Sequence, residues 1–165
     1  MKAPAKLAKK PATKLHIESS YLSCIYDPKL FKKVVVKTVA AIKRIMTARG
    51  VDAIAFRGSS GAALAFIVGH KLGLSLLHVR KDNSHSGLIV EGNVAAERIV
   101  IIDDFVASGN TINMIVSSLK KNMRPESDLR IVGMVLYNAS SPNDDLRRTC
   151  RSLPSTAIIE KFQVN

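Results

Sequence analysis

The sequence predicts an α/β fold with a mainly parallel sheet, because strand-like and helix-like stretches alternate along the chain. Residues 51–56 and 99–102 are short, mainly apolar runs. Each leads through a loop of small residues into a helical pattern, over 62–72 and 112–121. The run 99–102 contains only isoleucine and valine, without polar alternation. Such a strand is typical of a parallel sheet that is covered by helices on both faces.

The other expected elements follow the same alternation. Asp27 and Pro28 suit the N-cap and the first position of a long helix, and Gly50 suits its end. Segment 15–26 is mixed in character and has room for a short strand. The later expected elements are a strand that ends at Val79, a buried strand over 130–137, a short helix over 144–151 and a last strand over 156–159.

Length and composition indicate a single domain over 15–165, preceded by a flexible basic tail over 1–14. Apolar residues make up 47% of the 165, which argues against a disordered chain. No apolar run reaches the roughly 18 residues of a membrane span, so no membrane partner is expected. The start of the chain lacks the apolar stretch of a secretory signal, and two cysteines are too few for a disulfide framework. We therefore expect a cytoplasmic protein with reduced thiols.

The chain is basic, with a formal net charge of +12. Residues 1–14 contain five lysines and no acid, so the rest of the chain keeps a charge of +7. A basic balance favours polyanionic partners, among them phosphorylated substrates and nucleic acid. The simpler interpretation is a solvated tail and a soluble surface around a polyanionic substrate.

The strongest candidate site follows the strand over 99–102. Two carboxylates, Asp103 and Asp104, end this strand, and a loop of small residues leads into the next helix. The backbone N–H groups of this loop suit a phosphate, and Gly109 allows its close approach. Because two acids would repel a phosphate, we expect them to face vicinal hydroxyls or a cation. A phosphorylated sugar meets both requirements, and the alternative is a capped helix behind two solvated acids.

A second loop of this kind, Arg57–Gly61, follows the strand over 51–56. It lacks the Gly-Lys-Ser/Thr ending of a Walker A motif and the spacing of the dinucleotide-binding motif, so alone it also fits a tight turn. Two such loops at adjacent strand ends would be able to hold the two phosphorylated ends of one substrate.

Residues 101–111, Ile-Ile-Asp-Asp-Phe-Val-Ala-Ser-Gly-Asn-Thr, resemble the phosphoribosyl-pyrophosphate (PRPP) signature of the type I phosphoribosyltransferases. Residues 52–81 are similar to the matching stretch of the adenine and orotate phosphoribosyltransferases. Asn110 departs from the signature, where glycine is usual, although asparagine tolerates a left-handed backbone better than most residues. The resemblance implies that family's fold, a central, mainly parallel twisted sheet flanked by helices, with a small hood.

The resemblance also implies an activity, the Mg²⁺-dependent transfer of the 5-phosphoribosyl group from PRPP to a nucleobase. The products would be a nucleoside 5′-monophosphate and pyrophosphate. Asp103 and Asp104 would hold the ribose hydroxyls, shield positive charge at C1′ and meet Mg²⁺ through those hydroxyls or water. The implied 5′-phosphate site is Ala107, Ser108, Gly109, Asn110 and Thr111, and the implied pyrophosphate site is Arg57, Gly58, Ser59, Arg80 and Lys81. Relatives are commonly homodimers and often have a cis peptide in the pyrophosphate loop, here within 55–58.

Arg80 and Lys81 would begin the family's lid, which excludes water from the reacting C1′. Val90-Glu91-Gly92 resembles a trimmed end of the adenine enzymes' longer lid. Glu91 is therefore a candidate general acid toward the base, and equally a plain surface acid. The lysine that orotate enzymes carry in the lid is missing, and His85 falls one residue short of register. The acceptor base therefore stays open.

A function of a different class also stays open, that of a PRPP-sensing regulator of the same fold that binds RNA or DNA through its basic surface. The complete acid pair and the two loops favour the enzyme. The missing lid lysine and the net charge favour the regulator, and the fold alone does not separate the two.

Overall fold

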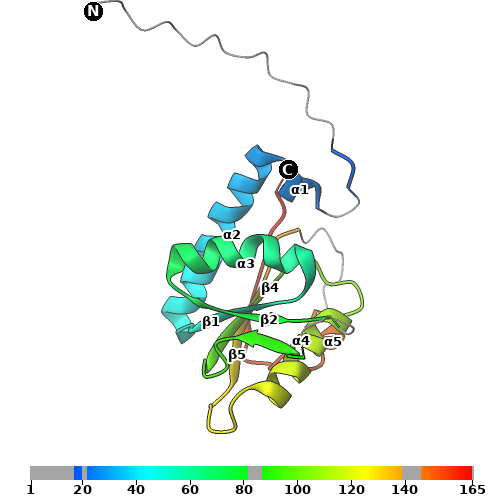
Figure 1. Cartoon of the computed structure of the whole chain (residues 1–165). Helices are drawn as coiled ribbons and strands as arrows, with labels where there is room; N and C mark the ends of the chain where they lie inside the picture. The colour runs from blue at the N-terminus through cyan, green and yellow to red at the C-terminus, as the bar shows by residue number, and fades with distance from the viewer. Residues whose placement is uncertain (1–16, 20–21, 82–86, 139–145, 165) are drawn as a thin grey trace, which may run out of the picture.

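The structure is a computed structural model that describes residues 17–19, 22–81, 87–138 and 146–164. Its strands are β1 (Ala53–Phe56), β2 (Ser75–Val79), β3 (Val90–Gly92), β4 (Arg98–Asp103), β5 (Arg130–Leu136) and β6 (Ile158–Lys161). Its helices are α1 (Ser23–Tyr26), α2 (Pro28–Arg49), α3 (Gly58–Leu72), α4 (Asn110–Asn122) and α5 (Leu146–Thr149). The strands form one sheet in the order β3-β2-β1-β4-β5-β6 (Figure 1). Every pairing is parallel except that of β2 with β3, so the predicted mainly parallel sheet is confirmed.

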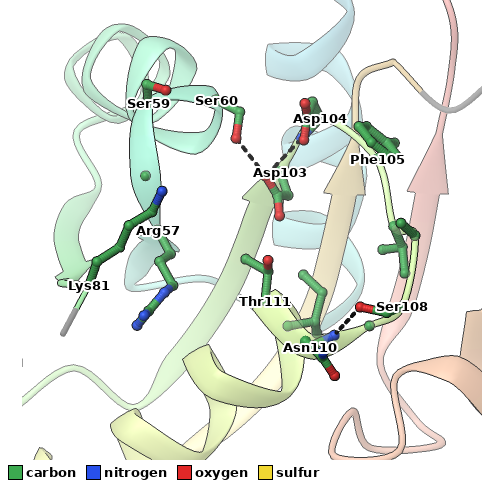
Figure 2. A pocket seen from close by; sticks show the side chains of 15 residues that line it. Arg57, Ser59, Ser60, Lys81, Asp103, Asp104, Phe105, Ser108, Asn110 and Thr111 are labelled. Atoms are coloured by element: carbon green, nitrogen blue, oxygen red, sulfur yellow. Dashed lines mark hydrogen bonds between the residues drawn. The ribbon is translucent and has the colours of Figure 1, made fainter. Parts of the chain in front are cut away.

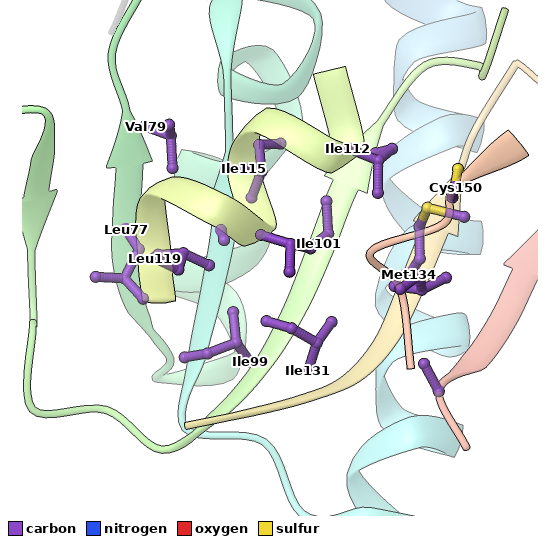
Figure 3. Packing of buried hydrophobic residues seen from close by; sticks show 14 of the residues in the cluster. Leu77, Val79, Ile99, Ile101, Ile112, Ile115, Leu119, Ile131, Met134 and Cys150 are labelled. Carbon is purple, nitrogen blue, oxygen red and sulfur yellow. The ribbon is translucent and has the colours of Figure 1, made fainter. Parts of the chain in front are cut away.

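Helices cover the sheet on both faces, and alternate residues of the central strand β4 point into two separate cores. Val100 and Ile102 pack with the side chains of α2 and α3 on one face. Ile99 and Ile101 pack on the other face, beneath α4 and α5 (Figure 3). All four side chains are fully buried, which explains why this strand contains no polar alternation.

The long helix α2 begins and ends where the sequence predicts. The Asp27 carboxylate accepts hydrogen bonds from the backbone N–H groups of Lys29 and Leu30, at 2.7 and 3.2 Å. Pro28 occupies the first helical position. At the other end Gly50 has a φ of +68° and donates its N–H to the Met46 carbonyl at 2.8 Å.

Three elements differ from their predicted form. Residues 23–26 form α1, so a strand is wrong for this part of segment 15–26. α3 begins at Gly58 rather than at residue 62. Its first four residues, Gly-Ser-Ser-Gly, have low helix propensity, which is why the sequence pattern placed the start later. β6 covers Ile158–Lys161, two residues later than expected. Residues 144–145 of the predicted short helix lie outside the described residues.

α1 and the segment after β6 lie at the carboxyl end of the sheet (Figure 1), and the small hood that the resemblance implies stays a prediction. α1 packs against the start of α2, and its Cys24 is buried in the same core as α2 and α3. The described helices include none that is long and apolar enough to cross a membrane.

Candidate active site

The carboxyl ends of β1 and β4 form the switch point of the sheet. These strands are parallel neighbours, but the chain leaves β1 through α3 toward β2 and leaves β4 through α4 toward β5. α3 and α4 lie on opposite faces, so the two helix starts diverge and leave a crevice, the usual ligand position in open α/β sheets. A cleft of about 230 Å³ lies there, lined by residues of both loops (Figure 2).

Most of the predicted site residues meet at this cleft. Those that line it are Arg57, Gly58, Ser59, Lys81, Asp103, Asp104, Ala107, Ser108, Gly109, Asn110 and Thr111. Arg57 and Lys81 lie on one side, Ser108 and Asn110 on the other, and Asp103 between them (Figure 2). Arg80 and Glu91 are not among the lining residues.

The acid pair is buried at the floor of the cleft. Asp103 and Asp104 are only 5% and 8% exposed. The Asp103 Oδ1 atom accepts hydrogen bonds from the Ser60 hydroxyl at 2.9 Å and from the Asp104 backbone N–H at 3.0 Å. Burial, and next the negative charge of Asp104, raise the pKa of Asp103 above its ordinary value. A bound cation, or hydroxyl donors on a ligand, would relieve this repulsion.

The first wall of the cleft is the start of α3. Arg57 is its N-cap and makes no side-chain capping bond, so the first N–H groups of this helix are available to an anion. Gly61 lets α3 approach the sheet, because a Cβ there would lie 2.8 Å from Phe56 Cβ and 2.9 Å from the Ile102 carbonyl oxygen. The described chain contains no cis peptide bond, so the cis peptide expected within 55–58 is wrong; Gly58 makes the turn with a φ of +70°.

The second wall is the loop 107–111 at the start of α4. Gly109 is the N-cap and has a φ of +77°. A Cβ at Gly109 would also lie 2.3 Å from the Thr149 carbonyl oxygen, so only glycine fits. Asn110, which departs from the signature, is the first residue of α4 and is therefore helical. The left-handed backbone position belongs to Gly109, so the asparagine does not have to adopt it.

Two cations complete the first wall. Arg57 is nearly buried, and its Nη1 donates to the Arg80 carbonyl oxygen at 2.6 Å, which fixes the guanidinium at the cleft. The Lys81 side chain runs past Gly58, where an added Cβ would lie 3.4 Å from its Cε. Both cations therefore lie beside the free N–H groups at the start of α3.

Arg80, which directly follows β2, forms an ion pair with Glu91 of the neighbouring strand β3. Arg80 Nη1 lies 3.1 Å from both carboxylate oxygens of Glu91. The carboxylate thus neutralises the guanidinium beside the cleft rather than within it. The role of Glu91 as general acid and that of Arg80 toward pyrophosphate stay predictions. Residues 82–86 of the expected lid, with His85, lie outside the described residues.

The sequence interpretation missed Ser60 and Tyr137. The fully buried Tyr137 follows β5, and its hydroxyl donates to the Ser60 carbonyl oxygen at 2.9 Å. Burial holds the pKa of Tyr137 well above its usual range, so the phenol acts as a neutral donor. A tyrosine at the end of a buried strand needs a partner for its hydroxyl, which is the signal that could have found this contact.

Comparison with known proteins identifies the family. The phosphoribosyl transferase domain family matches residues 61–164. Adenine phosphoribosyltransferase from Saccharomyces cerevisiae has a similar structure, with a TM-score of 0.61 and 18% identity over 86% of this chain and 83% of that one. Orotate phosphoribosyltransferase from Aeropyrum pernix has a TM-score of 0.60 and 15% identity, over 83% of this chain and 72% of that one. Adenine phosphoribosyl transferase from Trypanosoma brucei has a TM-score of 0.61 and 14% identity, over 83% of this chain and 65% of that one.

No curated protein matches the chain in sequence. The structural similarity, at these identities, establishes the fold, and the family match covers more than half of the chain. The resemblance of residues 101–111 to the PRPP signature is thereby confirmed at the level of the family. This chain belongs to the phosphoribosyltransferase family.

Proposed function

We propose that the protein transfers the 5-phosphoribosyl group of PRPP to a nucleobase and releases pyrophosphate. The observation that carries this proposal is a single cleft in which two helix starts flank a buried acid pair. The Trypanosoma brucei enzyme was solved in complex with AMP, pyrophosphate and ribose-5-phosphate. Those ligands carry phosphate groups and a ribose diol. The cleft here has N–H donors at two helix starts that suit phosphates, and two carboxylates that suit the diol.

The two phosphorylated ends of PRPP would bind opposite walls. The backbone N–H groups of 107–111, with the hydroxyls of Ser108 and Thr111, would bind the 5′-phosphate at the start of α4. The start of α3, together with Arg57 and Lys81, would bind pyrophosphate. Holding both ends fixes C1′ between them, so much of the rate would come from positioning.

The acid pair would act on the ribose. Asp103 and Asp104 accept hydrogen bonds from the ribose hydroxyls, and their charge stabilises the positive charge that develops at C1′. A nitrogen lone pair of the base forms the new bond to C1′, and the electrons of the broken C1′–O bond leave with pyrophosphate. The proton of the attacking base nitrogen is lost to solvent or to a nearby base.

Mg²⁺ fits this site as an ion shared with the substrate. Mg²⁺ usually binds one or two carboxylates together with water and substrate phosphates. Asp103 and Asp104 supply such carboxylates, and the described residues contain no cluster of three or more acids, histidines or cysteines that would form a cage. When bound, the ion would neutralise charge on the pyrophosphate leaving group.

The assembly and the compartment belong to the same proposal. Phe66 and Ile67 are exposed on the outer face of α3, 57% and 37% respectively, which supports a homodimer interface there. Cys24 and Cys150 are free thiols, which suits a reducing cytoplasm. Sedimentation of the wild type and of Phe66→Ser would test the dimer, and a monomeric wild type would contradict it.

Pyrophosphate release tests the proposed reaction. The protein is incubated with PRPP and Mg²⁺ and with adenine, guanine, hypoxanthine, xanthine, uracil or orotate in turn. We expect release that depends on one of these bases. The Asp103→Asn, Asp104→Asn double variant controls for a contaminating enzyme. Tight PRPP binding without release for any base would overturn the transferase and favour the PRPP-sensing regulator.

A further inference from the structure

The excess positive charge of the protein lies in two segments. Of its 25 lysines and arginines, five fall in residues 1–14 and seven in α2. The remaining 13 equal in number the 13 acids of the whole chain, and α2 itself contains no acid. The net charge of +12 therefore belongs to the tail and to one helix, and it is not spread over the surface.

All seven cations of α2 are exposed, and together we call them the α2 basic face. Its members are Lys29, Lys32, Lys33, Lys37, Lys43, Arg44 and Arg49. Arg49 is the last residue of the helix, four positions after the buried Ile45. The opposite face of the helix packs into the core through Val34, Ile42 and Ile45. With a rise of 1.5 Å per residue, the cations from Lys29 to Arg49 form a cationic strip about 30 Å long along the helix axis.

Among the residues that the structure describes, Lys29, Lys32, Lys43 and Arg49 have no acid partner. Glu160 of β6 binds Arg44 through both of its oxygens, at 3.0 and 2.7 Å. Lys37 donates to the carbonyl oxygen of Gln163, a neutral acceptor. Like charges one turn apart on a helix destabilise it, so the α2 basic face costs stability and adds nothing to the core.

The strip leads into a hollow at the amino edge of the sheet, the edge opposite the cleft. This basic hollow has a volume of about 760 Å³, and its lining includes Arg49, Arg98, Lys120 and Arg130. Arg98 and Arg130 pair with Asp52 and Asp128. Arg49 and Lys120 have no acid partner within the described part of the chain, so the hollow adds positive charge at the end of the strip.

We propose that the α2 basic face, continued by the basic hollow, binds the phosphate backbone of nucleic acid. Duplex DNA carries a negative charge about every 1.7 Å of its length, so a 30 Å cationic strip can contact several phosphates at once. None of the seven α2 cations lines the cleft, so this binding is separate from the transferase reaction.

The composition of the face favours nucleic acid over a lipid surface. A helix that lies in a membrane interface buries an apolar face in lipid, whereas the apolar face of α2 is already buried on the sheet. Val36 is the one large apolar side chain exposed along α2, and no aromatic residue of the helix is fully exposed. Tyr26, just before α2, is an exposed aromatic residue, but the helix itself offers none to stack on bases, so the contact along it would be with backbone phosphates and independent of base sequence.

Fluorescence anisotropy with labelled 20-nucleotide RNA, single-stranded DNA and duplex DNA tests the proposal on the full chain. The test variant is Lys29→Gln, Lys32→Gln, Lys43→Gln and Arg49→Gln. The matched control removes four exposed cations elsewhere, Lys71→Gln, Lys121→Gln, Arg124→Gln and Arg151→Gln. Circular dichroism checks that both fold, and pyrophosphate release should be unchanged in both.

We expect the α2 variant to lose at least tenfold in affinity, with the control near the wild type. The slope of log affinity against log salt should fall by about 0.9 for each lost phosphate contact on duplex DNA. Equal losses in both variants would mean that net charge alone is responsible, and would overturn the proposal. So would an unchanged α2 variant together with complete loss on deleting residues 1–14. Absence of binding, or preferential binding to phosphatidylserine vesicles, would overturn it as well.

Discussion

The Ser60 hydroxyl donates a 2.9 Å hydrogen bond to Asp103 Oδ1, and this bond joins the start of α3 to the end of β4 (Figure 2). The wall proposed for pyrophosphate and the acid proposed for the ribose are therefore mechanically connected. Tyr137 extends the connection, because its hydroxyl holds the Ser60 carbonyl oxygen. The two hydrogen bonds, from Tyr137 to Ser60 and from Ser60 to Asp103, therefore link the ends of β5 and β4 through the start of α3.

Removing the Ser60 hydroxyl should misplace Asp103. A hydrogen bond to a charged group contributes about 1.5–3 kcal/mol, so Ser60→Ala should lower kcat/KM for PRPP by about 10- to 100-fold. Ser60→Thr keeps the hydroxyl and should restore most of the activity. Steady-state kinetics of both variants, with thermal melting as a check on folding, measures this. Full activity in Ser60→Ala would show that Asp103 needs no such support.

Tyr137→Phe should lower stability while leaving the packing of the ring in place. The change removes a part-buried hydrogen bond, while the Ser60 carbonyl oxygen keeps its place in the helix α3, so we expect a net loss of about 0.5–1.5 kcal/mol. Urea unfolding should show a lower midpoint with an unchanged m-value. A midpoint equal to that of the wild type would mean that water replaces the lost hydroxyl at no cost.

Gly109→Ala and Gly73→Ala form a matched pair. Both glycines have a positive φ, of +77° and +66°. A Cβ at Gly73 would meet nothing within 4 Å, whereas one at Gly109 would meet the Thr149 carbonyl oxygen at 2.3 Å. Gly73→Ala should therefore cost only backbone strain, about 1–2 kcal/mol. Gly109→Ala should cost more and should also weaken phosphate binding, measured by urea unfolding and by calorimetry with inorganic phosphate. Equal costs would contradict the close contact.

The Asp52 and Arg98 pair should make stability depend on pH. Hydrogen bonds from the Arg98 side chain and backbone lower the pKa of Asp52. A lowered folded-state pKa contributes stability above the ordinary aspartate pKa of about 3.9, and this contribution is lost as pH falls through the folded value.

We therefore expect Asp52→Asn to unfold at lower urea than the wild type at pH 7, with the gap closing as pH falls below about 4. Asp128→Asn is the control, because Asp128 and its partner Arg130 are both largely exposed and should contribute little. A gap of constant size between pH 7 and pH 3.5 would contradict this account.

The sequence was sufficient for features that arise from local patterning. The apolar run 99–102 predicted a buried strand, and Asp27, Pro28 and Gly50 predicted both ends of α2, because caps and buried strands have short-range signals. The two loops proposed to bind phosphates were found from the sequence because the residues of each are contiguous in the chain, and their binding of phosphates stays a prediction. Their meeting at one cleft followed from the parallel order of the strands.

Contacts between distant residues were not predictable from local pattern. Tyr137 and Ser60 are 77 positions apart, and no short-range rule pairs a strand-end phenol with a helix-start carbonyl. The early start of α3 depends on packing of Gly61 against Phe56 and Ile102, which overrides the weak helix propensity of that segment. The ion pair of Arg80 with Glu91 depends on the antiparallel strand β3. This strand has only three residues, too few to show the alternation of apolar and polar residues that predicts a strand.

The assignment of Asp103 and Asp104 to the ribose is best tested by calorimetric binding of PRPP in the presence of Mg²⁺. Wild type is compared with the Asp103→Asn, Asp104→Asn double variant, whose amides keep the shape of the acids without their charge. We expect saturable binding by the wild type and at least tenfold weaker binding by a variant that melts normally. Equal affinity in the two proteins would contradict the assignment of the acid pair to the ribose and its metal ion.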